Sequence, residues 1–200
     1  MKILVKDNYF DNPDLIRQLG VSLSDYRIDN ELDGPPTGWR GQRSIPLYNL
    51  KNKILDNYSQ NIFNICCEYF DLKNYVYPYS NERAKKVSGE LMITTYFHIT
   101  TEETKKAFPD FSQDRFHKDF ASPVAGVVYL NPSAPPKAGT SVFDGKNNQM
   151  VNLENKYNRL VAYEGSRIHA LSDTFGNDVE TGRLTFTFFI HEKQFVEEFN

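Results

Sequence analysis

The sequence predicts a mainly β protein, a β-sandwich or barrel supported by N-terminal helices, and three observations lead to this prediction. From Leu91 onward, apolar and polar residues alternate with the period of two that strands require. These short runs follow one another at the spacing of two-sheet β folds. Before them, apolar residues recur with the helical period instead. We therefore expect a single domain over 1–200, with 1–88 mostly helical support and 89–191 the β core.

The N-terminal part contains a short strand and two helices. Ile3 to Val5 is a short apolar run typical of a strand. Asp11-Asn12-Pro13-Asp14 combines an Asx cap, a proline in the first turn and an acid near the positive end of the helix dipole, which predicts a helix over 12–24. Apolar residues at helical spacing predict a second helix over 49–70. The loop 34–41 holds Trp39, which either faces a substrate or, as we favour, packs on the core.

Six strands are expected in the β core: 91–98, 125–130, 140–143, 160–163, 167–171 and 183–190. Polar or proline-rich segments connect them, among them 101–114, 131–139 and 144–158.

The last of these strands predicts both a core face and a ligand-binding face. Its apolar face can pack against the helices and consists of Leu184, Phe186, Phe188 and Ile190. The opposite face carries Arg183, Thr185 and Thr187, together with Phe189, into the barrel. A buried arginine needs an anion, because an unpaired buried charge is costly. If the protein supplies no acid there, a ligand carboxylate is the natural partner.

A metal site is indicated by His117-Lys118-Asp119. In an extended segment the imidazole and the carboxylate project from one face, and together they are two of the three ligands of a facial iron site. The motif alone is weak, since short patterns often match by chance. His169 strengthens it, because it lies in a predicted strand about 50 residues further on and Arg183 follows it at the start of another strand.

The region from about Gly89 to His191 resembles the Fe(II)- and 2-oxoglutarate-dependent dioxygenases. The likeness is greatest to the prolyl-4-hydroxylase-like branch with its small stand-alone bacterial and viral members. The matching stretches are Phe116–Asp119, Val127–Asn131, Ala138–Phe143, Gly165–His169 and Gly182–Thr185. The resemblance implies a double-stranded β-helix, a jelly-roll, cupin-like core. The spacing between His169 and Arg183 is longer than is usual in the family, and residues 1–88 carry no motif of it.

The resemblance also implies roles for individual residues. His117, Asp119 and His169 would hold the catalytic Fe(II). Arg183 would bind the far carboxylate of 2-oxoglutarate, with hydroxyl groups from Tyr129 and Thr185. The co-substrate and O2 would take the three remaining metal positions, and turnover would release succinate and CO2. The carboxylate of Asp119 favours hydroxylation over halogenation, because halogenating relatives have a small residue in its place.

The substrate cannot be read from the sequence. A small molecule or a peptidyl side chain such as proline would suit the resemblance, and alkylated bases are also substrates in this superfamily. The net charge of −3 argues against nucleic acid and anionic membranes as partners. No apolar run approaches the ~20 residues of a membrane span. The charged start of the chain does not resemble a signal peptide, and the adjacent Cys66 and Cys67 suit a reducing compartment, so we expect a cytoplasmic protein.

Two other functions fit part of the pattern. A cupin-like metal enzyme that does not use 2-oxoglutarate would keep the three metal ligands. A non-enzymatic jelly-roll module that binds a sugar or a protein would need none of them. Neither explains an arginine inside the barrel at position 183.

Overall fold

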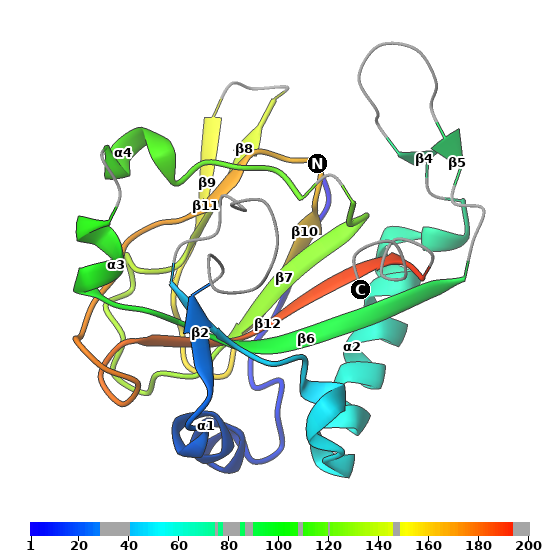
Figure 1. Ribbon diagram of the computed structural model, residues 1–200. Coiled ribbons are helices and arrows are strands. Elements are labelled where there is room, and N and C mark those ends of the chain that lie inside the picture. The colour runs from blue at the N-terminus through cyan, green and yellow to red at the C-terminus, as the bar shows by residue number, and fades with distance from the viewer. Residues whose placement is uncertain are drawn as a thin grey trace.

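A seven-stranded antiparallel sheet and a three-stranded antiparallel sheet form the centre of the protein (Figure 1). The computed structural model describes residues 1–28, 41–74, 76–77, 85–86, 90–107, 110–119, 121–145 and 149–193. The large sheet has the order β1 (Ile3–Lys6), β10 (Leu160–Glu164), β7 (Val124–Tyr129), β12 (Arg183–Glu192), β6 (Leu91–Thr100), β3 (Gln42–Ser44) and β2 (Tyr26–Ile28). The small sheet has the order β11 (His169–Leu171), β8 (Thr140–Asp144) and β9 (Gln149–Leu153).

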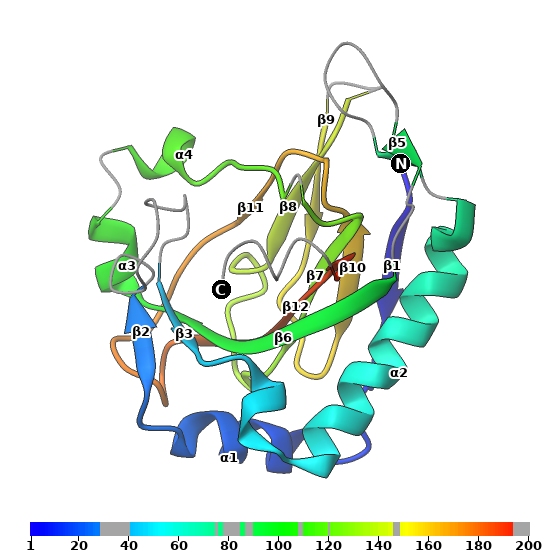
Figure 2. The same cartoon turned by 45° about the vertical axis from the view of Figure 1, so that its right-hand side comes forward.

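The remaining elements are helical, apart from the short pair β4 (Val76–Tyr77) and β5 (Lys85–Lys86). The helices are α1 (Pro13–Ser22), α2 (Lys53–Phe70), α3 (Glu102–Lys106) and α4 (Phe111–Asp114). Two 3-10 turns, η2 (Leu47–Leu50) and η3 (Leu72–Asn74), flank α2. Figure 2 shows α1 and α2 on the side of the large sheet that faces away from the small sheet. No helix in the described ranges is long and apolar enough to cross a membrane.

The main apolar core lies between the large sheet and the helices α1 and α2. The predicted apolar face of β12 is buried in it, which confirms the assignment of Leu184, Phe186, Phe188 and Ile190. The helices contribute Ile16, Leu55, Ile62 and Cys66. Helix α1 approaches the sheet closely at Gly20, where a Cβ atom would lie 2.9 Å from Phe97. The opposite face of the same strand is thereby left to form the interior between the two sheets.

Both long helices begin where their capping residues place them. The side chain of Asn12 accepts a hydrogen bond from the backbone of Leu15 at 3.0 Å, and α1 starts at the following proline as predicted. Helix α2 starts later than the predicted residue 49, because Asn52 caps it by accepting from the backbone of Ile54 at 3.0 Å. The helix ends at Phe70, and Asp71 then adopts a left-handed conformation with φ of 54°.

Three segments differ from the expectation. The N-terminal part contains the predicted strand at Ile3–Val5, seen as β1 at one edge of the large sheet, but it is less helical than predicted, since β2 and β3 lie at the other edge. The predicted loop 101–114 contains α3 and α4, and the polar segment 144–158 contains β9. Strand β9 is an exposed edge strand with no fully buried residue, so its sequence shows little alternation of apolar and polar side chains. The segment with Trp39 lies outside the described residues.

Asp7 connects the end of β1 to the segment before β10. Its carboxylate accepts hydrogen bonds from Arg159 Nε at 2.6 Å and from Lys156 Nζ at 2.7 Å, and these bonds hold the pKa of Asp7 well below its usual range. We expect Asp7→Asn to lower the free energy of unfolding at pH 7 by about 1 kcal/mol or less, because solvent screens a partly exposed pair.

The effect of Asp7→Asn should depend on pH. The carboxyl has a lower pKa in the folded than in the unfolded chain. Its contribution is therefore complete above the unfolded value of roughly 4, and is lost as the pH falls through the folded value. Urea unfolding of both proteins at pH 7 and pH 3 measures this. A difference between the proteins that is equal at the two pH values would contradict the assignment.

Candidate metal centre

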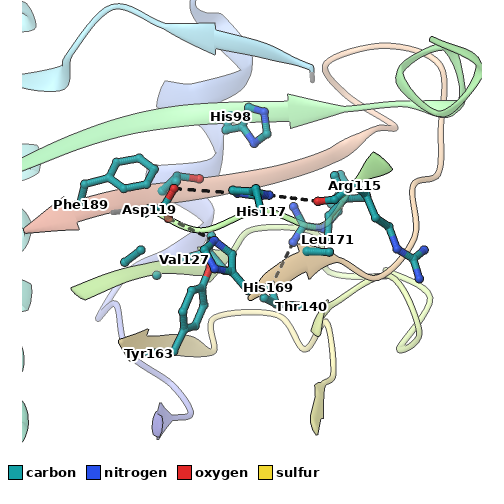
Figure 3. A pocket seen from close by; sticks show the side chains of 15 residues that line it. His98, Arg115, His117, Asp119, Val127, Thr140, Tyr163, His169, Leu171 and Phe189 are labelled. Atoms are coloured by element: carbon teal, nitrogen blue, oxygen red, sulfur yellow. Dashed lines mark hydrogen bonds and ion pairs between the residues drawn. The ribbon is translucent and has the colours of Figure 1, made fainter. Parts of the chain in front are cut away.

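Three potential metal ligands meet at one end of the space between the two sheets. One atom from each of His117, Asp119 and His169 lies within 4.8 Å of the others, and this is the one such group found among the described His, Cys, Asp and Glu residues. His169 Nε2 is 3.1 Å from Asp119 Oδ2, and His117 Nε2 is 3.9 Å from Asp119 Oδ1. Figure 3 shows the three side chains directed toward one another. The three residues that the sequence suggested as metal ligands thus lie close together in the fold.

Backbone hydrogen bonds hold these ligands in place. The segment of His117 lies antiparallel to β11, and the backbones of His117 and His169 exchange two hydrogen bonds, at 3.0 and 2.9 Å. The N–H of Asp119 donates to the carbonyl of Gly165 at 2.8 Å. The segment is therefore extended, and His117 and Asp119 project from one face, as the sequence predicted.

The tautomers of both histidines suit metal binding. Nδ1 of His117 is 3.0 Å from the carbonyl oxygen of Arg115, and Nδ1 of His169 is 2.8 Å from that of Arg167. A carbonyl only accepts, so each Nδ1 carries the proton and each Nε2 presents a lone pair toward Asp119. Burial lowers the pKa of His117, and the neighbouring His169 adds to this effect, while Asp119 opposes it. The neutral form of His117, which binds metal, is thereby favoured.

The carboxylate of Asp119 supports the same conclusion. Its Oδ2 atom is buried and accepts no hydrogen bond from the part of the chain that the structure describes. An anionic oxygen beside two nitrogen lone pairs is unfavourable unless a cation lies among them. Two imidazoles and one carboxylate on one side of an octahedral ion are the donor set of non-haem Fe(II) sites. The residues present therefore fit an Fe(II) ion.

Arg183 lies in the wall of the same pocket. Its side chain is buried, with Nε donating to the carbonyl of Ala138 at 2.9 Å and Nη2 to that of Gly139 at 3.1 Å. Burial lowers the pKa of Arg183. Within the described ranges no carboxylate forms an ion pair with this guanidinium. The structure thus places in the pocket a positive group that has no counter-ion among the described residues, and the alternation of β12 predicted its inward position.

Tyr129 and Thr185 lie behind the pocket wall. The hydroxyl of Tyr129 donates to Thr140 Oγ1 at 2.8 Å, and its ring lies against the guanidinium of Arg183, 5.5 Å from ring centroid to Cζ. Thr185 Oγ1 is 3.3 Å from the carbonyl of His98 and 2.9 Å from Thr187 Oγ1. Both hydroxyls are engaged within the protein, so their contact with a co-substrate stays a prediction.

Other polar side chains reach the pocket in addition to the metal ligands and Arg183. His98, Thr140, Tyr163 and Thr187 all line it. Thr187 was expected there, because strand alternation places it on the same face as Arg183. His98 lies opposite Thr185 in the pairing of β6 with β12, which became apparent only with the register of the two strands. Thr140 and Tyr163 carry no sequence signal that separates them from other strand residues.

Gly165 positions Asp119. A Cβ atom at this glycine would lie 2.1 Å from the carbonyl oxygen of Ser122 and 2.9 Å from that of Asp119. We expect Gly165→Ala to destabilise the metal-free protein by about 1–3 kcal/mol and to weaken metal binding, because the backbone that carries Asp119 must move. Thermal unfolding and metal titration measure the two effects. Gly145→Ala is the control, since its Cβ would meet only Arg167 Nη1 at 3.8 Å. Wild-type metal affinity in Gly165→Ala would contradict this role.

Comparison with known proteins identifies the fold. No protein-family profile and no curated protein matches the sequence. Among solved structures, the chain is similar to a prolyl-4-hydroxylase from Pseudomonas putida, with 17% identity, a TM-score of 0.57, and 96% of this chain and 92% of that chain covered. The protein has the fold of this enzyme.

Two further structures share the double-stranded β-helix fold with this chain. HygX from Streptomyces hygroscopicus, solved with nickel and 2-oxoglutarate bound, matches with 10% identity, a TM-score of 0.56, and coverage of 96% and 83%. The α-ketoglutarate-dependent epimerase SnoN from nogalamycin biosynthesis matches with 9% identity, a TM-score of 0.54, and coverage of 95% and 77%. The fold class expected from the sequence is confirmed, and within the double-stranded β-helix His117, Asp119 and His169 form a facial triad.

Proposed function

We propose that the protein is an Fe(II)- and 2-oxoglutarate-dependent oxygenase of the hydroxylase type. The observation that carries this proposal is the presence, in one pocket, of the facial triad and of the buried Arg183, which has no carboxylate partner among the described residues. The triad supplies ligands for the metal, and the arginine supplies a site for the far carboxylate of a dicarboxylic co-substrate. A cupin-like enzyme that does not use 2-oxoglutarate would need only the triad.

Each part of the pocket has a task in this function. His117, Asp119 and His169 would hold Fe(II) and leave its other positions open. Arg183 would orient 2-oxoglutarate through its far carboxylate. Apolar side chains in the wall, among them Val127 and Phe189, limit the access of water. When bound, iron and 2-oxoglutarate would together allow O2 to oxidise the substrate, and succinate and CO2 would be released.

Hydroxylation is the outcome that the triad favours. The carboxylate of Asp119 occupies the position that halogenating relatives leave open. The similar structures include both a hydroxylase and an epimerase. Identification of the reaction product, a hydroxylated substrate or an epimer, therefore distinguishes the two activities. We propose that the substrate is a small molecule or a peptidyl side chain such as proline. The net charge of −3 argues against a nucleic-acid substrate. The cytoplasmic location stays a prediction that both free cysteines suit.

Titration without oxygen tests the proposal. Wild-type protein is mixed with Fe(II) alone, with 2-oxoglutarate alone and with both, and a visible charge-transfer absorption is expected only with both. Metal binding without this absorption would favour the cupin-like enzyme, and absence of metal binding would favour the binding module. Succinate release on addition of O2, measured across candidate substrates, then identifies the substrate class.

A further inference from the structure

Tyr163 brings a hydroxyl group into the metal pocket from β10. The residue is only 5% exposed, and its ring packs on the imidazole of His169 with 4.6 Å between ring centroids. Figure 3 shows the side chain reaching from its strand toward the triad. Among the residues that the structure describes, none forms a hydrogen bond with the Tyr163 hydroxyl, although the side chain lines the pocket.

Other buried tyrosines of this chain have partners for their hydroxyls. Tyr9 donates to Asn61 Oδ1 at 2.9 Å, and Tyr129 donates to Thr140 Oγ1 at 2.8 Å. Such pairing is the rule, because a buried polar group without a hydrogen bond destabilises the fold. The Tyr163 hydroxyl is not one of the fully buried side-chain atoms that lack a partner, because it is open to the pocket. It is therefore available to donate a hydrogen bond to a ligand in that pocket.

The groups that share the pocket with Tyr163 indicate which ligand this is. Asp119 and His169 of the triad and the guanidinium of Arg183 line the same pocket. The hydroxyl therefore lies in one pocket with both the metal triad and the arginine. A 2-oxo acid that joins these two groups would pass the hydroxyl, and its oxygen atoms can accept a hydrogen bond from it.

We propose that the Tyr163 hydroxyl donates a hydrogen bond to an oxygen atom of the 2-oxo acid held between the triad and Arg183. Tyr163 then binds the co-substrate from the side of the large sheet that faces the small sheet. This inference rests on the proposed function and adds to it a binding residue that the family motifs of the sequence do not include.

The test compares wild type with Tyr163→Phe by two measurements. Without oxygen and with Fe(II) bound, the variant should bind 2-oxoglutarate roughly tenfold more weakly, the loss typical of one hydrogen bond to a charged group. Its affinity for Fe(II) alone should be unchanged. The melting temperature of its metal-free form should not be lower than that of wild type, because the hydroxyl forms no hydrogen bond with the described residues and is open to the pocket.

Tyr9→Phe is the matched control. This tyrosine is equally buried but lies outside the pocket, and its hydroxyl is paired. It should show the opposite pattern, with a lower melting temperature and unchanged affinity for 2-oxoglutarate.

Two results would overturn the inference. One is wild-type affinity for 2-oxoglutarate in Tyr163→Phe, and the other is a lowered melting temperature of the metal-free variant, which would indicate a structural hydroxyl. If wild type itself binds Fe(II) but no 2-oxoglutarate, the proposed function fails, and this inference fails with it. If wild type binds both and the variant binds equally well, only the role of Tyr163 is lost.

Discussion

Asp119→Ala is expected to abolish iron-dependent consumption of 2-oxoglutarate, with a fall in succinate formation of about 100-fold or more. The substitution removes the one anionic ligand of the triad, whose Oδ2 atom is 3.1 Å from His169 Nε2. His169→Ala should have the same effect, because it removes a buried imidazole whose lone pair faces that carboxylate. Succinate release per protein, measured at saturating Fe(II) and 2-oxoglutarate, tests both variants.

Stability measurements separate a lost ligand from a lost fold. Metal-free Asp119→Ala should melt at or above the temperature of wild type, because a buried carboxylate oxygen without a hydrogen-bond donor is removed. Added Fe(II), which raises the melting temperature of wild type by binding the folded state, should no longer do so. Asp25→Ala, at an exposed carboxylate that pairs with Arg27, is the control and should behave as wild type. Unchanged succinate formation in both triad variants would refute the metal site.

Arg183→Met is expected to raise the concentration of 2-oxoglutarate needed for half-maximal turnover by roughly 30-fold or more. Removal of one partner of a buried, hydrogen-bonded charge pair costs about 2–5 kcal/mol. The affinity for Fe(II) alone should be unaffected, since the arginine is not a metal ligand. Titration of the Fe(II)-loaded variant with 2-oxoglutarate without oxygen measures the effect directly.

Two further variants complete this experiment. Arg183→Lys keeps the charge but loses the planar pair of donors, so it should weaken the binding of 2-oxoglutarate less than Arg183→Met does. Arg159→Met removes an arginine that pairs with Asp7 away from the pocket, and it should leave binding unchanged. Arg183→Met also loses the hydrogen bonds to the carbonyls of Ala138 and Gly139, so affinities must be compared below the melting temperature of this variant. An unaltered requirement for 2-oxoglutarate would remove Arg183 from this role.

The features that could be predicted from the sequence were those governed by strand alternation and capping. The alternation of residues 183–190 placed Arg183 on the inner face and Leu184, Phe186, Phe188 and Ile190 on the core face. The spacing of His117 and Asp119 was sufficient to put both on one face, because the segment is extended beside β11. Asn12 and Pro13 placed the start of α1.

The features that could not be predicted depend on contacts between distant segments. Strand β9 forms because it pairs with β8, whereas its own exposed residues carry little preference. The hydroxyl of Tyr129 donates to Thr140, a neighbour that only the packing of the two sheets reveals, and the contact of Tyr129 with the co-substrate stays a prediction. The place of the Tyr163 hydroxyl in the pocket depends on the pairing of β10 and on its contact with His169, which the sequence alone does not reveal.

The reciprocal backbone bonds between His117 and His169 have a consequence for the order of assembly. These bonds join two ligands about 50 residues apart through the backbone alone, so the loop between them can be closed by folding without a bond to the ion. Binding of the metal then requires little ordering of the chain. Little of the free energy of metal binding is therefore lost to ordering, and the affinity for the metal is higher. Chelation should therefore strip the ion reversibly and leave amide exchange in β11 slow, in contrast to small zinc domains that unfold without their metal.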